Sequence, residues 1–284
     1  ATQKGDPNFS ERFIRECQAL GRLNHPHIVK IIDYGEWDRI YLYLVMEFLE
    51  VVPLSDCFQS HAAPDQEMIK VVLAGVCDAL IAAHDAGIVH RDLKPENIIL
   101  VPFCGMKHFP KLIDFGIAKI KTQYGETLTS LTEDGIVLGT PRYMSPEQLM
   151  GNHVGLSSDI YSLGVLLYHW VCGFPPFDGD VVQMIQGHLH QMPPPCSAMT
   201  SRPLAQSLEP LMLKAMSKNP AFRFNAVKTF KDVLMTALSQ SPHHWEGGLI
   251  PHTLNIRGHW LGWGILATGI WLVVMIVLTV MHHR

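Results

Sequence analysis

The chain has 284 residues, enough for one large domain or two small ones, and its 48% hydrophobic content supports a real core. The formal net charge is −4, so the composition gives no basic surface that would indicate a nucleic-acid partner. The six cysteines contain no C-x-x-C pair, which argues against a zinc site or a disulfide scaffold and favours a reducing compartment.

The predicted elements mix helices with short strands at first and become mainly helical later. Asn8 and Glu11 predict the capped start of a helix that runs to about Leu23 with one apolar face. The elements expected after it are a hairpin over 31–50 with its turn at 35–38, a helix over 67–86 that ends at Gly87, strands over 98–101 and 111–113, a mobile loop over 117–138, and helices over 159–172, 180–190, 207–217 and 226–238.

A dense polar motif, His90-Arg91-Asp92-Leu93-Lys94-Pro95-Glu96-Asn97, lies between the second helix and the two short strands. Asp114-Phe115-Gly116 follows directly after those strands. The ordered pair reads H-R-D-L-K-P-E-N and D-F-G, the pattern of a phosphoryl-transfer loop followed by a metal-binding loop. The alternative is that Asp92 and Asn97 are ordinary turn residues and that Asp114 is a loop cap. It does not explain why the second motif, with Asp114, supplies the metal ligand that the first motif lacks.

These residue types suit phosphoryl transfer, which depends mainly on positioning and charge neutralisation. We expect Asp92 to accept or orient the proton of the attacking hydroxyl, and Lys94 to neutralise charge on the transferred group. Asn97 and Asp114 offer oxygen ligands of the kind that Mg²⁺ (or Mn²⁺) prefers. The two short strands would bring both residues to one metal site.

On these motifs, residues 8–238 resemble a Hanks-type (eukaryotic-like) Ser/Thr protein kinase, most closely the bacterial membrane-anchored kind. The resemblance implies an α+β, protein-kinase-like fold of two lobes with a mainly helical C-lobe. It also implies that ATP is the phosphate donor, with Mg²⁺ or Mn²⁺, and that Ser and Thr hydroxyls of protein substrates are the acceptors.

Several residues match nucleotide-binding positions of this family. Glu16 matches the helix glutamate that pairs with a nucleotide-binding lysine, and Met46 matches the gatekeeper. The backbone from Glu47 to Leu49 matches the hinge that binds adenine, and Ile99 is expected to line the same site.

Other matches concern substrate class and docking. Lys94 and Thr140 favour a Ser/Thr enzyme over a tyrosine kinase, because the family equivalent of Thr140 bonds the catalytic aspartate and lysine. The alternative for Thr140 is a plain turn residue beside a proline. Residues 139–148 resemble the substrate-docking segment, and the resemblance implies a buried ion pair between Glu147 and Arg223.

The resemblance also implies supporting and regulatory roles. His90, Phe115 and Asp159 are expected to support the catalytic and metal-binding loops, with Asp159 holding the catalytic-loop backbone. Arg91 matches an arginine that often binds a phosphate on the activation loop, and Thr132 is the best-placed acceptor. The alternative for Thr132 is a solvated loop hydroxyl.

The C-terminal part, from residue 241 on, differs in composition from the rest of the chain. Residues 241–259 predict a juxtamembrane linker, and residues 260–281 carry no charged side chain over 22 positions. Such a run spans roughly 30 Å as a helix and predicts one transmembrane segment; the alternative is a buried core helix. Because ATP is cytosolic, the expected location is the inner (cytoplasmic) membrane, crossed once, with the kinase domain in the cytosol. Gly258 and Gly262 suit helix packing, which leaves a homodimer for trans-autophosphorylation as an open option.

The chain departs from the family at its start. No glycine-rich phosphate loop or strand lysine precedes residue 8, so residues 1–49 predict an incomplete N-lobe and residues 50–240 the C-lobe. We therefore expect a fragment of a longer chain, in which the apolar face of the first helix is under-covered. Two alternative functions stay open: a membrane-tethered pseudokinase or docking module, and a small-molecule phosphotransferase.

Overall fold

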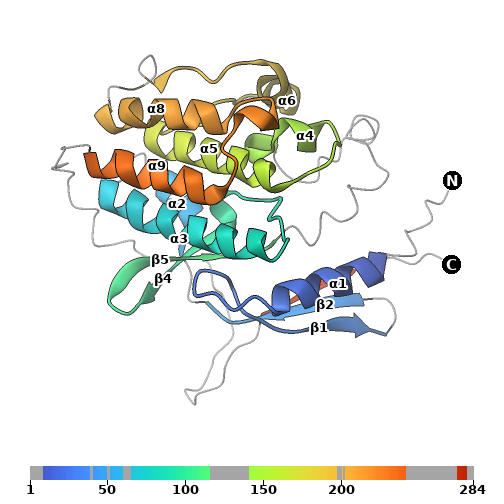
Figure 1. Ribbon diagram of the computed structural model, residues 1–284. Coiled ribbons are helices and arrows are strands. Elements are labelled where there is room, and N and C mark those ends of the chain that lie inside the picture. The colour runs from blue at the N-terminus through green and yellow to red at the C-terminus, as the bar shows by residue number, and fades with distance from the viewer. Residues whose placement is uncertain are drawn as a thin grey trace.

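The structure is a computed structural model, and it describes residues 9–38, 41–49, 52–59, 65–115, 141–196, 200, 202–240 and 274–279. A small region of one helix and a sheet lies below a larger, mainly helical region (Figure 1). The described elements, in chain order, are α1 (Phe9–Gly21), β1 (Ile31–Trp37), β2 (Tyr41–Met46), β3 (Val52–Pro53), α2 (Leu54–Gln59), α3 (Gln66–Asp85), η1 (Pro95–Asn97), β4 (Ile98–Phe103), β5 (Met106–Leu112), η4 (Pro141–Tyr143), α4 (Pro146–Leu149), α5 (Leu156–Cys172), α6 (Val181–His190), α8 (Pro203–Ala215), η5 (Pro220–Phe222), α9 (Val227–Gln240) and β6 (Val274–Thr279).

The small region packs α1 against a three-stranded antiparallel sheet in the order β1-β2-β6. The apolar face of α1 is buried, since Phe13 and Cys17 are fully covered and Leu20 is 5% exposed. These side chains join Leu42 and Leu44 of β2 in the main hydrophobic core. The expectation that this helix face would be under-covered is therefore wrong.

Within the segment predicted as a transmembrane helix over 260–281, the structure describes residues 274–279 as strand β6. Residues 274–279 pair antiparallel with β2, from Tyr41 opposite Thr279 to Met46 opposite Val274. Four of the six residues are β-branched, which favours a strand, and this pairing covers an edge of β2 that would otherwise be open. No helix among the described residues is both long and apolar enough to cross a membrane. Residues 260–273, 280 and 281 and the predicted linker over 241–259 lie outside the described residues.

The helical region is organised around α5, most of whose side chains are buried. Helix α5 packs on α8, and α3 packs on α9 (Figure 1). The contact of α5 with α8 is close at Gly164, where a Cβ atom would lie 2.8 Å from the Cβ of Ala215. Because the buried side chains of both regions form one continuous cluster, the small region shares its core with the helical one.

The predicted helices agree with the observed ones to within two to four residues at their ends. Asp65 caps α3, Asp180 forms a capping box with Gln183 at the start of α6, and Gly173 ends α5 in the left-handed conformation. Two predictions need correction. The hairpin turn predicted at 35–38 lies later, because residues 35–37 belong to β1, and the second short strand begins at Met106 rather than at residue 111. Strands β4 and β5 turn tightly at Cys104-Gly105, both with positive φ.

Candidate active site

The catalytic-loop motif lies between α3 and β4, and a buried carboxylate fixes its backbone. Asp159, near the start of α5, accepts the backbone N–H groups of His90 and Arg91, each at 2.9 Å. Asp159 Oδ2 also contacts His84 Nε2 at 2.8 Å, and its side chain is 1% exposed. These bonds hold Arg91 at φ 64°, a conformation that non-glycine residues rarely adopt.

Asp92, Lys94 and Asn97 converge on one another. Lys94 Nζ lies 2.8 Å from Asp92 Oδ2, and Asn97 Nδ2 donates to the carbonyl oxygen of Asp92 at 2.7 Å and to its Oδ2 at 3.2 Å. Because the amide nitrogen of Asn97 is engaged in this way, its Oδ1 atom is the end available to a cation. The arrangement gives Asp92 a fixed orientation beside a positive charge.

Strand pairing brings the two predicted metal ligands to one edge of a sheet. Asn97 immediately precedes β4 and Asp114 follows β5 by two residues; Ile98 pairs with Leu112, and the N–H of Ile113 donates to the Asn97 carbonyl at 3.0 Å. Asp114 is exposed and has φ 59°, so its carboxylate faces away from the core. Asn97 and Asp114 therefore lie at the same end of the β4–β5 pairing.

His90 and Phe115 form the support beneath these loops. Their rings lie 4.6 Å apart, His90 is fully buried and Phe115 is 4% exposed. Burial lowers the pKa of His90, so the neutral ring donates from Nε2 to the Ile113 carbonyl at 3.2 Å. Its Nδ1 can then accept the N–H of Asp92, which lies 3.3 Å away. His90 thus links the two loops.

The residues predicted to bind the base lie where β2 leaves the small region. Met46 packs against the main core, whereas Leu49 packs against a separate small cluster that contains Ile99. The Glu47 side chain is held by Lys111 Nζ at 2.6 Å and by the Lys30 N–H at 2.9 Å. The Glu47 N–H donates to the Lys30 carbonyl, so this N–H is engaged within the protein. Leu49 thus packs against the buried cluster that contains Ile99.

Glu16 has a different partner from the one predicted. Its Oε1 atom accepts a bond from Arg91 NH1 at 3.1 Å, so it pairs with the catalytic loop instead of with a lysine. The physical reason is that Arg91 is the cation that the catalytic loop brings to α1. Burial raises the pKa of Glu16, and the charge of Arg91 partly offsets that effect.

The ion pair between Glu147 and Arg223 is present and buried. Arg223 NH1 and NH2 bind Glu147 Oε1 and Oε2 at 2.7 and 2.8 Å, and the side chains are 0% and 7% exposed for arginine and glutamate respectively. Ser158 Oγ also donates to Glu147 at 2.6 Å. Burial alone would raise the pKa of Glu147, but the bonds from Arg223 and Ser158 outweigh burial and lower it.

Sequence reasoning missed two supporting residues. Gln148 Nε2 donates to the Arg91 carbonyl at 2.6 Å, and His84 shares the carboxylate of Asp159 with the catalytic loop. Both contacts join residues more than fifty positions apart, so no local spacing signals them. Of the predicted site residues, Thr132 and Thr140, as well as Gly116 of the D-F-G motif, lie outside the described residues.

The residues present fit a divalent cation with a nucleotide. Asn97 Oδ1 and the exposed Asp114 carboxylate are hard oxygen donors of the type that Mg²⁺ prefers. Such an ion usually keeps several waters and takes only one or two protein carboxylates together with substrate phosphates. Within the described ranges no cluster of three or more His, Cys, Asp or Glu side chains forms a closed metal cage.

Comparison with known proteins agrees with this geometry. Residues 1–235 match the protein kinase domain family. Serine/threonine-protein kinase pkn3 of Myxococcus xanthus is 38% identical over 232 residues, which is 81% of this chain and 42% of the relative. Pkn1 of the same organism is 39% identical over 236 residues, 82% of this chain and 33% of the relative.

A third relative is serine/threonine-protein kinase PknB of Mycobacterium tuberculosis, which is 37% identical over 241 residues, 84% of this chain and 37% of the relative. The chain thus spans between a third and somewhat over two fifths of the length of these relatives. The match covers both the catalytic loop and the docking segment on which the site is built. The chain belongs to the protein kinase domain family.

Proposed function

We propose that this protein is a Ser/Thr protein kinase that transfers the γ-phosphate of ATP to hydroxyl groups of protein substrates. The observation that carries the proposal is the joint placement of Asp92, Lys94 and Asn97, with Asp114 beside them across the β4–β5 pairing. The names of relatives, which are serine/threonine kinases, support the substrate class.

In this mechanism the chain mainly positions charges. The Asp92 carboxylate orients the attacking hydroxyl and takes its proton, and Lys94 and Asn97 fix this carboxylate through Oδ2. Lys94 lies close enough to neutralise charge on the transferred phosphoryl group. Bound Mg²⁺ would neutralise the phosphates, and Asn97 and Asp114 would hold it. Leu49 and Ile99 would pack against the base.

Regulation through Arg91 is part of the same proposal. Arg91 Nε is buried and, among the described residues, has no hydrogen-bond partner, while NH1 binds Glu16. A phosphate on Thr132 would offer Arg91 a charge-assisted partner. Such phosphorylation could take place in trans within a homodimer, which is also an expectation here.

A second candidate is a catalytically impaired, docking-type kinase domain. The observation that favours it is the Glu16–Arg91 pair, in which Glu16 is engaged by the catalytic loop. For the chain as it stands, we therefore predict weak ATP binding and slow turnover.

Nucleotide binding measured by calorimetry, with and without Mg²⁺, tests the site. Asp114→Asn should weaken Mg²⁺-dependent ATP binding by at least about tenfold, equivalent to about 1.4 kcal/mol, because a charged ligand is lost. Asp92→Asn should keep binding but abolish transfer of radiolabelled phosphate to casein. If Asp114→Asn binds Mg-ATP as the parent does, the metal assignment is wrong; phosphate transfer by Asp92→Asn would remove Asp92 from its role.

We also propose that residues 260–281 anchor the protein in the cytoplasmic membrane, with residues 1–259 in the cytosol. In the anchored state, residues 274–279 would leave their pairing with β2. Two features support this anchor: the segment has no charged side chain, and tryptophans stand at its start. Expression with and without residues 260–284, followed by carbonate extraction of membranes, provides the test. Retention of both forms in the soluble fraction would contradict the anchor.

A further inference from the structure

Strand β5 carries a lysine on the face that meets the segment predicted to bind the base. Lys111 pairs with Ile99 across the β4–β5 ladder, and side chains directly opposite each other in an antiparallel pair lie on the same face. Ile113, two positions later on β5, shares this face. Ile113 and Leu49 both pack against the small cluster that contains Ile99. Lys111 therefore stands on the strand face against which Leu49 packs.

The Lys111 ammonium binds the carboxylate of Glu47, two residues before Leu49. Lys111 Nζ donates to Glu47 Oε1 at 2.6 Å, and the side chains are 15% and 27% exposed for lysine and glutamate respectively. The same oxygen accepts the Lys30 N–H at 2.9 Å, and the Lys30 carbonyl accepts the Glu47 N–H at 2.9 Å. Glu47 is therefore fixed from two sides, by the backbone that leads into β1 and by a side chain of β5.

The end of β5 is bonded along both of its edges. On one edge the Val29 N–H donates to the Leu112 carbonyl at 2.9 Å, and the Leu112 N–H donates to the His27 carbonyl at 2.8 Å. On the other edge Leu112 lies opposite Ile98 of β4. Lys111 thus projects from a strand whose backbone is fixed, whereas ion pairs between two solvent-exposed side chains contribute little because both must be ordered.

We propose that Lys111 is a positioning residue for the nucleotide: through Glu47 it holds the backbone of residues 47–49 in place against the Ile99 face. The inference rests on the proposed kinase function, because residues 47–49 and Ile99 are the features that would contact the base. Lys111 acts on the base through Glu47 and not on the metal, since the Ile113 N–H still holds Asn97 beside Asp114 when the ion pair is broken.

Nucleotide binding to the full 284-residue chain separates the base from the metal. Adenosine reports on the base site, and the ratio of ATP affinities with and without Mg²⁺ reports on the metal site; calorimetry measures both. We expect Lys111→Met to bind adenosine at least about fivefold more weakly than the parent, with the Mg²⁺ ratio unchanged within about twofold. Asp114→Asn should show the opposite pattern, with a lower Mg²⁺ ratio and the adenosine affinity of the parent.

Two further variants show whether the effect passes through the ion pair. Glu47→Gln keeps an oxygen that can accept the Lys30 N–H but loses the charge, so its adenosine affinity should fall as in Lys111→Met. The double variant should bind adenosine as each single variant does, because both substitutions remove the same interaction. Lys111→Arg retains the cation and should bind adenosine within about twofold of the parent.

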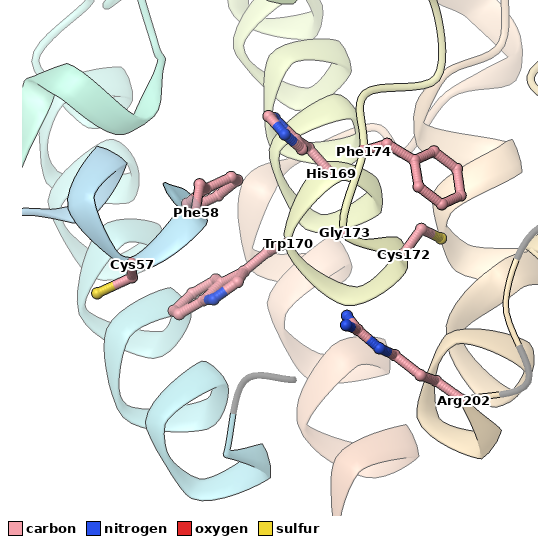
Figure 2. A pocket seen from close by; sticks show the side chains of 8 residues that line it. All are labelled: Cys57, Phe58, His169, Trp170, Cys172, Gly173, Phe174 and Arg202. Atoms are coloured by element: carbon pink, nitrogen blue, oxygen red, sulfur yellow. The ribbon is translucent and has the colours of Figure 1, made fainter. Parts of the chain in front are cut away.

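Lys231→Met is the matched control, because Lys231 of α9 binds Asp78 of α3 at the same 2.6 Å and its side chain is 23% exposed. Trp170→Leu is a control for lost stability. It removes a ring that stacks on Phe58 at 5.9 Å, beside a cavity of about 270 Å³ at the C-terminal end of α5 (Figure 2). Both controls should keep the adenosine affinity of the parent.

Three results would overturn the positioning role: equal adenosine affinity in Lys111→Met and the parent, an equal loss in Lys231→Met, or no adenosine binding by the parent. The kinase proposal is judged separately by phosphate transfer to casein. Transfer by the parent, with unchanged adenosine affinity in Lys111→Met, refutes only the role of Lys111. The expected binding pattern without transfer refutes only the activity.

Discussion

Charged side chains are more deeply buried, and make more hydrogen bonds, in the helical region than in the small region. In the helical region, Arg223 is fully buried and binds Glu147 through two nitrogens, and it also donates to the carbonyls of Ser157, Ser217 and Lys218. In the small region, the Glu16 side chain is 32% exposed and accepts a bond from Arg91 at 3.1 Å. Charges that fix the geometry of the catalytic loop thus come from the helical side.

This difference shows where the reactive geometry is determined. Asp92 is oriented by Lys94 and Asn97 within its own loop, and the loop is fixed by Asp159 of α5. Helix α1 reaches the loop through Glu16 and Arg91, at the periphery of that network. We infer that the catalytic and metal-binding geometry persists when contacts of the small region are altered.

The largest effect is expected for Arg223→Met. Removing one partner leaves Glu147 as a buried charge with one remaining side-chain donor, so unfolding free energy should fall by about 3–5 kcal/mol. Urea denaturation at pH 7 measures this value. The exposed pair Lys228–Asp232 on α9 is the control, since Lys228→Met should cost at most about 0.5 kcal/mol. Similar losses in the two variants would contradict the distinction between buried and exposed pairs.

An intermediate effect is expected from acid, through His188 in the helical region. This ring is fully buried between the Tyr161 hydroxyl at 2.9 Å and the Arg142 carbonyl at 3.0 Å, and burial lowers its pKa to about 3. A histidine with a lowered folded pKa contributes stability that is present above its unfolded pKa and lost as pH falls. Between pH 7 and pH 5 this group should cost about 1–2 kcal/mol of unfolding free energy.

His188→Gln keeps a donor for the Arg142 carbonyl but cannot titrate, so it isolates this contribution. We expect a smaller loss between pH 7 and pH 5 in the variant than in the parent, by urea denaturation at both values. The other histidines titrate equally in the two proteins and cancel in the comparison. Parallel losses in both proteins would show that His188 does not titrate with unfolding.

Local patterns predicted much of the helical region. Gly87, which follows α3, and the run of apolar residues over 159–172 are signals read within a few residues, and the end of α3 and most of α5 follow from them. The same holds for the catalytic motif, whose spacing relative to β4 and β5 decides that Asn97 and Asp114 meet. Helix α2 and strand β3 were missed because each is only a few residues long.

Contacts between distant segments could not be predicted in the same way. The pairing of β6 with β2 depends on an open sheet edge, and that edge is visible only once the fold is known. The bonds from His84 to Asp159 and from Arg91 to Glu16 each join residues 75 positions apart. A sequence motif predicts which residue type stands at a position, such as the arginine at position 91. Which side chain it binds depends on the tertiary packing, and the motif does not contain that information.

The smallest effect is expected for Glu16→Gln in the small region. Because burial raises the pKa of Glu16 despite Arg91, its ionised form is less favourable in the folded chain than in the unfolded one. The stability from this group is complete below its unfolded pKa and is lost as pH rises through its raised folded pKa. At pH 7 the variant, whose amide oxygen can still accept from Arg91, should be unchanged or more stable by at most about 0.5 kcal/mol.

The same variant separates the two regions functionally. If the geometry of Asp92 and Asp114 is determined by the helical region, Glu16→Gln should bind Mg-ATP with the affinity of the parent chain, measured by calorimetry beside Asp114→Asn. A loss of affinity as large as that of Asp114→Asn would mean that Glu16 acts on the phosphates directly, and that the small region contributes more to the site than its single bond to Arg91 indicates. Unchanged affinity together with unchanged stability would place the metal-binding half of the site in the helical region, with α1 contributing only a peripheral contact.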